Sequence, residues 1–371
     1  MYEMTHLYKI LYLSFILTMI ISLPQQTLAQ EPTVYEKAEQ MIIIGFRGSS
    51  VKDTGDVFSI LEHMNVGGII FFDYDTGTKS YNRNIKSKAS LSVFIKEIKK
   101  KAQTPLFLSI DEEGGKVSRL KKISGYGKTN STKSISIHSS KKIQDIFTWR
   151  ATKIATYGFN MNFAPVIDLC YQKTIMNTQE RCFSTDPVRV ANLASSFAET
   201  MKKRSIIPVY KHYPGIGSGT VDTHVRAASL PVHTQNDYLP FKTVCGKGSY
   251  PVIMISHVHM TAVDTLPASL SKKHIDTLST LGCNHALLIS DDMDMGAISD
   301  MYTLAEILEK SINAGVDMLI FSNNIRMYDE NKYIKIKSTL KELIDSGKIS
   351  KEQVEASYEK IIKYKKEFNI M

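Results

Sequence analysis

Eight short apolar runs recur along the chain, and they restrict the possible folds more than any other feature of the sequence. Most are continuous rather than alternating and are rich in Ile, Leu, Val and Phe, as is typical of strands buried on both faces. The runs are Met41 to Phe46, Gly67 to Phe72, Leu106 to Ile110, Met161 to Ile167, Ile206 to Tyr210, Val252 to Ser256, Ala286 to Ser290 and Met318 to Phe321.

Segments of helical period lie between these runs. They are Leu91 to Lys101, Lys141 to Thr156, Val190 to Lys203, and Thr303 to Ala314, the last of which begins with a capping box of Thr303 and Glu306. Alternating strands and helices predict a (β/α)8 TIM-type barrel, in which some strands can be irregular. A doubly wound open sheet is the alternative, because the number of strands alone does not separate the two folds.

The chain is predicted to end in a helix that packs against the barrel. Ser350 and Gln353 form a second capping box at its start. The apolar side chains expected on one face are Val354, Tyr358, Ile361 and Ile362.

The first 29 residues read as a signal peptide. Lys9 precedes the apolar run Ile10 to Leu23, and Thr27-Leu28-Ala29 is a small-x-small cleavage site. The run is short for a membrane span, although an uncleaved anchor is the alternative. We therefore expect an exported protein, periplasmic or secreted, with no stable membrane insertion after cleavage. Residues 30–371 are expected to form a single barrel domain, a size that one such barrel accommodates.

The formal net charge is +9, from basic residues scattered through amphipathic segments. Solvated helix faces explain this pattern, and weak attraction to an anionic polymer is the alternative. No zinc-finger, helix-turn-helix or RNA-binding signature indicates a nucleic acid partner.

The chain has four cysteines, at positions 170, 182, 245 and 283, whose spacings match no metal motif. Export permits disulfides. Cys170 and Cys182 bracket one loop and are the most plausible pair, with two buried thiols as the alternative.

Polar clusters follow most of the strand-length runs, where barrel enzymes place their reacting groups. They are Asp111 to Arg119, Asp168, Lys211-His212, His257-Val258-His259 and Asp291-Asp292-Met293-Asp294. Two carboxyl-rich strand ends suggest glycoside hydrolysis, which uses a pair of acidic groups. A divalent ion held by His212, His224, His257, His259 and the aspartates is the alternative. It is weaker, because His257-Val258-His259 is the only His-x-His pair and does not follow the first strand.

The segment Lys211 to His224 contains glycines at 215, 217 and 219 and ends in the pair Asp222-x-His224. Glycines permit backbone angles that other residues resist, so this segment is expected to form a movable loop. It would present an imidazole with its own carboxylate partner.

Six motifs in the same order resemble the bacterial β-N-acetylglucosaminidases of glycoside hydrolase family 3. Lys211 to Ser218 and Asp222 to His224 are similar to the family's Lys-His-Phe-Pro-Gly-His-Gly-Asp and Asp-Ser-His, with Ile216 and Ser218 as the main differences. The other matches are Asp111 to Arg119 with Asp-Gln-Glu-Gly-Gly-Arg-Val-x-Arg, Asn162 to Asp168 with Asn-Phe-Ala-Pro-Val-x-Asp, Arg181 to Ser184 with Arg-Ser-Phe-Gly, Ser290 to Met293 with Ser/Thr-Asp-x-Leu/Met, and Ala314 to Asp317 with the segment that enters the last strand.

The resemblance implies a role for each matched residue. Asp291 would be the nucleophile, His224 the general acid and then the base, and Asp222 the group that orients the ring. Strand alternation places Asp292 on the opposite face, so we expect it to be structural. The residues implied to hold the terminal sugar are Asp111, Arg119, Arg181, Lys211 and His212.

The sequence thus predicts a retaining glycosidase that removes terminal β-linked N-acetylglucosamine from cell-wall, muropeptide-like saccharides, with no cofactor and no metal. Phosphorolysis is chemically open, because a neutral histidine base leaves less negative charge near an incoming anion, but it ranks below hydrolysis. The remaining alternatives are a β-glucosidase of the same broad family, a sugar-binding homologue impaired by Ile216 and Ser218, and a metal-dependent hydrolase.

Overall fold

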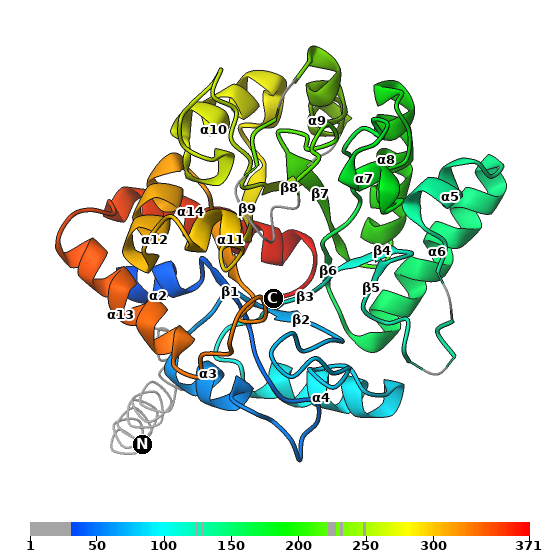
Figure 1. Ribbon diagram of the computed structural model, residues 1–371. Helices are drawn as coiled ribbons and strands as arrows, with labels where there is room; N and C mark the ends of the chain where they lie inside the picture. Colours follow the sequence, from blue (N-terminus) through cyan, green and yellow to red (C-terminus); the bar gives the residue numbers. More distant parts are fainter. Residues whose placement is uncertain (1–30, 124, 128, 222–227, 231–232, 248–249) are drawn as a thin grey trace, which may run out of the picture. The chain divides into compact units, whose positions relative to one another are not determined.

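All eight apolar runs form parallel strands, and these strands close into one barrel (Figure 1). Their bounds are β1 Ile42–Gly45, β2 Gly68–Phe71, β3 Phe107–Ile110, β6 Met161–Asn162, β7 Ile207–Tyr213, β8 Val252–Ile255, β9 Leu287–Asp292 and β10 Met318–Phe321. The predicted TIM-type barrel is confirmed, and the open-sheet alternative is wrong because β1 pairs with both β2 and β10.

The computed structural model describes residues 31–123, 125–127, 129–221, 228–230, 233–247 and 250–371. Residues 34–371 form one compact unit. The predicted signal peptide, residues 1–29, lies outside the described residues. No helix of the described chain has the length and apolarity that a membrane span requires.

The strands form because most residues in them are apolar and buried. Ile42, Ile43 and Ile44 of β1 each expose at most 1% of their surface. Burial of one such side chain stabilises the fold by about 1.5–3 kcal/mol. The closing register pairs Ile43 with Ile320, so residues far apart in sequence share this core.

A ring of helices surrounds the barrel (Figure 1). The helices are α2 Val34–Glu39, α3 Val57–His63, α4 Lys88–Lys101, α5 Thr132–Ser136, α6 Ser140–Tyr157, α7 Ile175–Thr178, α8 Pro187–Lys202, α9 Gln235–Lys247, α10 Lys272–Leu278, α11 Gly296–Ser299, α12 Leu304–Ala314, α13 Lys332–Asp345 and α14 Lys351–Glu367. The four predicted helical segments correspond to α4, α6, α8 and α12. The capping box of Thr303 and Glu306 is confirmed.

The ends of β6 and β7 depart furthest from their apolar runs, and both differences shape the site. β6 ends at Asn162, although the run continues to Ile167; Pro165 lacks the N–H that a strand ladder requires. β7 continues to Tyr213, with a shift of register against β8 after Tyr210. Lys211 and His212 therefore lie within β7 rather than after it.

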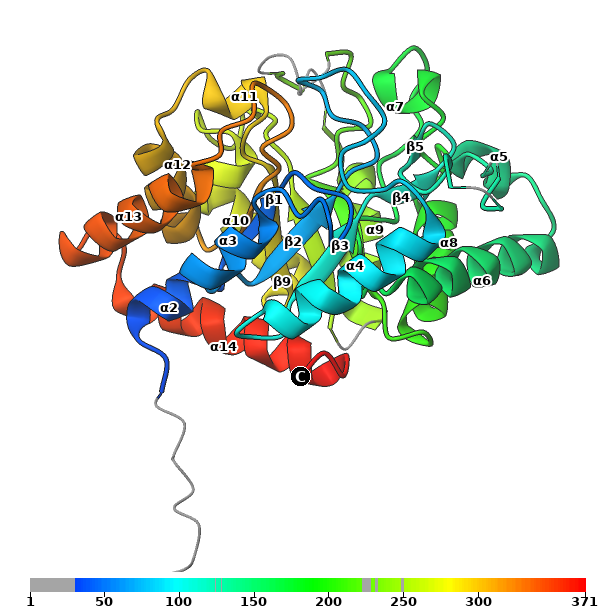
Figure 2. The same cartoon turned by 90° about the horizontal axis from the view of Figure 1, so that it is seen from below.

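The two ends of the barrel are covered differently (Figure 2). α14 lies across the amino ends of the strands, whereas α7, α11 and the short hairpin of β4 (Glu112–Gly114) and β5 (Val117–Ser118) lie at the carboxyl ends. The predicted contact of the last helix with the barrel is confirmed, since the Tyr364 hydroxyl accepts the N–H of Leu287 in β9 at 3.1 Å.

The buried face of α14 is rotated from the predicted one. Val354 and Ile361 are buried as expected, but Tyr358 and Ile362 are only half-buried. The face also buries Ser357, Tyr364 and Lys365. The predicted capping box is half formed: Ser350 caps the N–H of Gln353, whereas the Gln353 amide donates to Ser357.

Lys365 inserts a charged group into the closed end of the barrel. Its side chain is fully buried, and Nζ donates to Oε1 of Gln40 at 2.6 Å and lies 5.2 Å above the ring of Phe107. Burial lowers the pKa of Lys365 to about 7, because the charged form loses its hydration.

Replacing Lys365 with Met should change how stability depends on pH. Between pH 7 and the unfolded value of 10.5 the unfolded chain binds the proton more strongly, so wild-type stability rises with pH, by up to about 1.4 kcal/mol per pH unit. Urea unfolding from pH 6 to 10 measures this slope. Lys365→Met should lose it and the exposed control Lys366→Met should keep it; equal slopes in all three proteins would contradict the prediction.

Two disulfides lie in the folded unit. The predicted pair Cys170–Cys182 is bonded, with Cα atoms 5.4 Å apart. The second bond, Cys245–Cys283, joins α9 to the π-helical segment η2 (Ser279–Cys283) and was not predicted. Its cysteines are 38 residues apart, and sequence alone does not reveal such pairings.

Candidate functional site

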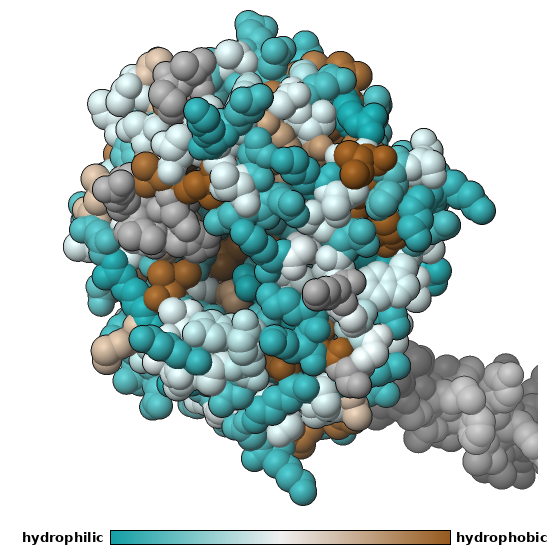
Figure 3. Space-filling model, turned by 45° about the vertical axis from the view of Figure 1, so that its right-hand side comes forward, coloured by the Kyte–Doolittle hydropathy of each residue, from teal (hydrophilic) through white to brown (hydrophobic). Residues whose placement is uncertain are grey.

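A cavity of 340 Å³ opens at the carboxyl ends of the barrel strands. Its volume lies in the range of small-molecule sites, about 300–1,000 Å³. Figure 3 shows the surface hollowed at the centre of the view, with apolar side chains inside the hollow. The apolar lining includes Phe72, Phe163, Met176, Met254 and Val258.

Six of the predicted site residues line this one cavity, although they come from distant parts of the chain. They are Asp111, Arg119, Arg181, Lys211, His212 and Asp291. Asp222 and His224 lie outside the described residues, so the predicted acid–base pair has no structural description.

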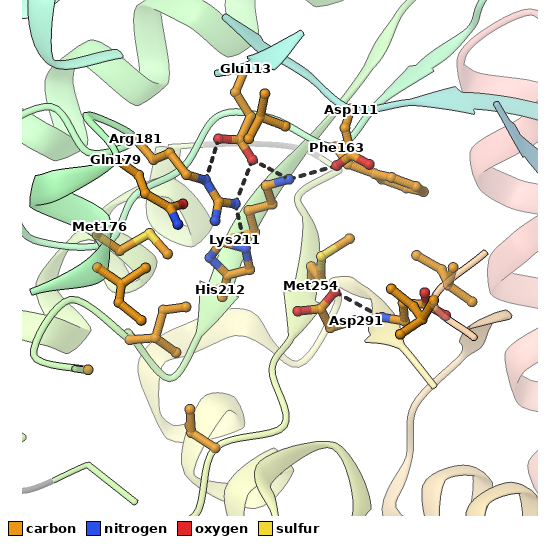
Figure 4. A pocket seen from close by; sticks show the side chains of 18 of the residues that line it. Asp111, Glu113, Phe163, Met176, Gln179, Arg181, Lys211, His212, Met254 and Asp291 are labelled. Carbon is orange, nitrogen blue, oxygen red and sulfur yellow. Dashed lines mark hydrogen bonds and ion pairs between the residues drawn. The ribbon is translucent and has the colours of Figure 1, made fainter. Parts of the chain in front are cut away.

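Lys211 lies at the centre of a buried charge network (Figure 4). Its Nζ is 2.9 Å from Oδ1 of Asp111 and 2.8 Å from Oε1 of Glu113. Arg181 donates to both oxygens of Glu113, from Nε at 2.9 Å and from an Nη at 2.8 Å. The two cations are thus held in place by carboxylates and not by solvent.

This network shifts the protonation of its members toward the charged forms. Burial alone would raise the pKa of Asp111 and of Glu113, but Lys211 with Arg119 for the first, and Arg181 with Lys211 for the second, lower both. For Lys211, burial lowers the pKa, yet the two carboxylates raise it overall. The site therefore holds fixed charges at neutral pH.

Arg119 reaches the cavity from the segment after β5. It lies 3.5 Å from Asp111 and 3.8 Å from Asp73, which follows β2. Its guanidinium also lies 5.3 Å from the ring of Phe72. The arginine thereby links the ends of two neighbouring strands across the mouth of the barrel.

His212 is oriented by Asp168, which follows β6. Its Nδ1 lies 2.7 Å from Oδ2 of this carboxylate, so the proton of the neutral ring belongs on Nδ1. Nε2 is then the acceptor, 3.5 Å from an Nη of Arg181. The ring turns its acceptor nitrogen toward the cationic side of the cavity.

Asp291 faces the cavity from β9, on the side away from Arg181 and His212 (Figure 4). Its Oδ1 accepts the backbone N–H of Asp292 at 2.8 Å. Asp292 itself accepts the N–H groups of Ser322 and Asp294, as expected of a structural residue, although it also borders the cavity. Burial and the neighbouring Asp294 raise the pKa of Asp292 to about 7.

The described histidines of the metal alternative, His212, His257 and His259, have separate hydrogen-bond partners. Both ring nitrogens of His257 have partners, Oγ of Ser269 at 2.7 Å and the carbonyl of Asp292 at 2.9 Å. His259 faces the carbonyl of Thr265. In the part of the chain that the structure describes, no three His, Cys, Asp or Glu side chains are grouped as metal ligands would be.

The sequence reasoning missed two residues of the site, Glu113 and Asp168. Glu113 is two residues after Asp111, a spacing that places both side chains on one face of an extended segment. Asp168 was noted as a strand-end residue, but its pairing with His212 joins residues that are 44 positions apart.

Comparisons with known proteins agree with this geometry. The family model described as "Glycosyl hydrolase family 3 N terminal domain" matches residues 33–364. A protein named beta-hexosaminidase from Tolumonas auensis is 30% identical over 275 residues, which cover 71% of this chain and 78% of that protein. Beta-hexosaminidase LpqI of Mycobacterium tuberculosis is 27% identical over 302 residues, covering 77% of this chain and 72% of that protein.

A solved structure of a glycosyl hydrolase of the same family, from Mycobacterium smegmatis, superimposes with a TM-score of 0.77 at 25% identity. The match covers 91% of this chain and 98% of that one.

Proposed function

Because this chain belongs to glycosyl hydrolase family 3, we propose that it is a retaining β-N-acetylhexosaminidase. The relatives named beta-hexosaminidase support the activity. The observation that supports it most directly is the placement of Asp291 on one side of a cavity whose other side is dense in charged donors and acceptors. The preferred substrate is terminal, non-reducing, β-linked N-acetylglucosamine.

Asp291 is the proposed nucleophile. Its carboxylate attacks the anomeric carbon as the bond to the leaving oxygen breaks, and a covalent glycosyl-enzyme forms with inverted configuration. Water then attacks the same carbon, releases Asp291 and restores the original configuration. The N–H of Asp292 holds one oxygen of the nucleophile in place.

His224 is the proposed proton donor to the leaving oxygen and, in the second step, the base that accepts a proton from water. A group with an unperturbed pKa near neutrality suits both duties. Asp222 orients its ring. These two assignments rest on the family motif.

The charge network is the proposed binding site of the terminal sugar. Asp111 accepts hydrogen bonds from sugar hydroxyls. Arg119, Arg181 and Lys211 donate charged hydrogen bonds to the sugar oxygens, and His212 offers a neutral ring nitrogen. Pre-ordered polar groups favour a polyhydroxylated ring over analogues that leave a buried group unpaired.

The proposed setting is outside the cytoplasm, on cell-wall fragments. A cleaved leader over residues 1–29 would release the barrel into the periplasm or the medium. The net charge of +9 suits contact with an anionic wall polymer.

Turnover of two aryl glycosides tests this function. The purified protein should hydrolyse aryl β-N-acetylglucosaminide at least about 100-fold faster than aryl β-glucoside, because buried polar partners discriminate strongly. NMR of the first product should show the β-anomer, and EDTA should not reduce the rate of hydrolysis. The variant His224→Ala should hydrolyse the N-acetylglucosaminide about 10²-fold more slowly, or worse. Preference for the glucoside, or loss of turnover with EDTA, would contradict the proposal.

A further inference from the structure

A small apolar cluster lies beside the cavity and separate from the main barrel core. We call it the disulfide cluster; its buried members are Val166, Cys170, Met176 and Cys182, and Ile175 and Ile216 pack against it. The Cys170–Cys182 bond closes a loop of sequence separation 12 within it. This cluster joins the segment after β6 to the segment after β7.

The loop between the two cysteines supplies a large part of the cavity wall. Met176, Gln179 and Arg181 all line the cavity and all lie inside the loop (Figure 4). Arg181 is the residue next to Cys182, and its N–H donates to the carbonyl of Met176 at 2.9 Å. The disulfide therefore fixes the backbone from which the guanidinium of Arg181 reaches Glu113.

The base of the loop after β7, residues 214–221, docks on the same cluster. Ile216 donates its N–H to Oδ1 of Asp168 at 2.8 Å. Ile175 donates its N–H to the carbonyl of Gly219 at 3.1 Å. A Cβ atom on Gly217 would lie 2.2 Å from the carbonyl oxygen of Leu169, so only glycine permits this close approach.

The docking also explains one difference from the family motif. Ile216 occupies the position where the motif has histidine. Its side chain packs against the disulfide cluster, where an apolar group is stabilised and an unpaired imidazole would be costly.

From these contacts we propose that the Cys170–Cys182 disulfide is a positioning element of the site. It holds Arg181 against Glu113 and holds residues 214–221 against the loop after β6. Without the bond between these two cysteines both segments could shift. Misplacement of a binding residue by about 1 Å can reduce the rate about 100-fold. This inference rests on the proposed function for its effect on turnover.

The second disulfide provides a matched control. Cys245 and Cys283 are as buried as Cys170 and Cys182, but they join α9 to η2 and do not border the cavity as described. Their sequence separation is 38 rather than 12, so their bond restricts the unfolded chain more. Comparing the two pairs therefore distinguishes an effect on stability from an effect on the positions of the cavity residues.

The first experiment compares two double variants on aryl β-N-acetylglucosaminide. Cys170→Ala with Cys182→Ala should lower kcat/KM more than about tenfold, with a raised KM, because the sugar-binding cations lose their fixed position. Cys245→Ala with Cys283→Ala should keep kcat/KM within about twofold, while losing at least as much melting temperature. Equal kcat/KM in the two variants would overturn the proposal, as would free thiols at positions 170 and 182 in the purified protein.

A second measurement does not depend on turnover or on the first variant folding. In the Cys245→Ala, Cys283→Ala protein, a phosphine reduces the remaining disulfide; it takes oxygen from water to become the phosphine oxide, and each sulfur becomes a thiol. Amide exchange of Ile175 and Ile216 should then accelerate more than about tenfold while that of β1 stays unchanged. Unchanged exchange at both amides would refute the positioning role, whereas lack of turnover by the oxidised wild type would refute only the proposed function.

Discussion

Asp291→Ala is expected to lower kcat on aryl β-N-acetylglucosaminide by more than about 10³-fold, because it removes the covalent route altogether. The fold should survive the change. The side chain is only half-buried, and its Oδ1 accepts the N–H of Asp292. Steady-state kinetics with a matched melting curve measures both effects.

Azide provides the positive test of this assignment. A small anion in the space left by Asp291→Ala can attack the anomeric carbon from the same side and yield an α-glycosyl azide. Asp276→Asn, an exposed carboxylate on α10, should retain wild-type turnover. Residual activity within about tenfold of wild type, or a β-azide product, would rule out Asp291 as the nucleophile.

Glu113→Gln should cause the second-largest effect, on both stability and substrate binding. Its carboxylate is 1% exposed and accepts hydrogen bonds from Arg181 and Lys211. An amide leaves two buried cations with one fewer negative partner, and breaking such a pair costs about 3–5 kcal/mol of unfolding free energy. KM should rise together with this loss, because both cations line the cavity.

The loss of stability in Glu113→Gln should depend on pH. The pKa of Glu113 lies below the unfolded value of 4.5, since its two cations outweigh burial. Its stabilising contribution is therefore complete above pH 4.5 and is lost as the pH falls toward the native pKa. Urea unfolding at pH 7 and pH 3.5 should show a larger gap between wild type and Glu113→Gln at pH 7.

A carboxylate one residue from Arg181 serves as the control for this change. Glu180 is exposed, and Glu180→Gln should alter unfolding by less than about 0.5 kcal/mol at either pH. Equal stability of Glu113→Gln and Glu180→Gln at pH 7 would show that the network does not need its central acid.

The barrel could be predicted from the sequence because its signal is local. Runs such as Met318 to Phe321 are short and continuously apolar, which is typical of a strand covered on both faces. Strand ends were less predictable. β7 continues through Lys211 and His212 because partners from other strands neutralise and orient these polar groups, which a linear pattern does not reveal.

The site could be predicted as a set of residues but not as a network. Six of its residues were identified from motifs and strand ends, and all six line one cavity. Glu113 was missed because its importance comes from the convergence of Arg181 and Lys211, which are 68 and 98 positions away in the chain.

The buried face of the last helix could also be predicted only in part. Lys365 looks like a solvated residue in the sequence, yet it is fully buried under the barrel. Helical period correctly placed Val354 and Ile361 inside, but the contact with Gln40 and Phe107 sets the rotation of the helix, and those residues lie more than 250 positions earlier.

The pairing of β1 with β10 has a consequence for biosynthesis. Ile43 has no strand partner on one side until Ile320 has left the ribosome, so a nascent chain exposes unpaired backbone on two strands for most of its synthesis. Such edges invite association between chains. The barrel therefore has two open edges until translation has passed β10.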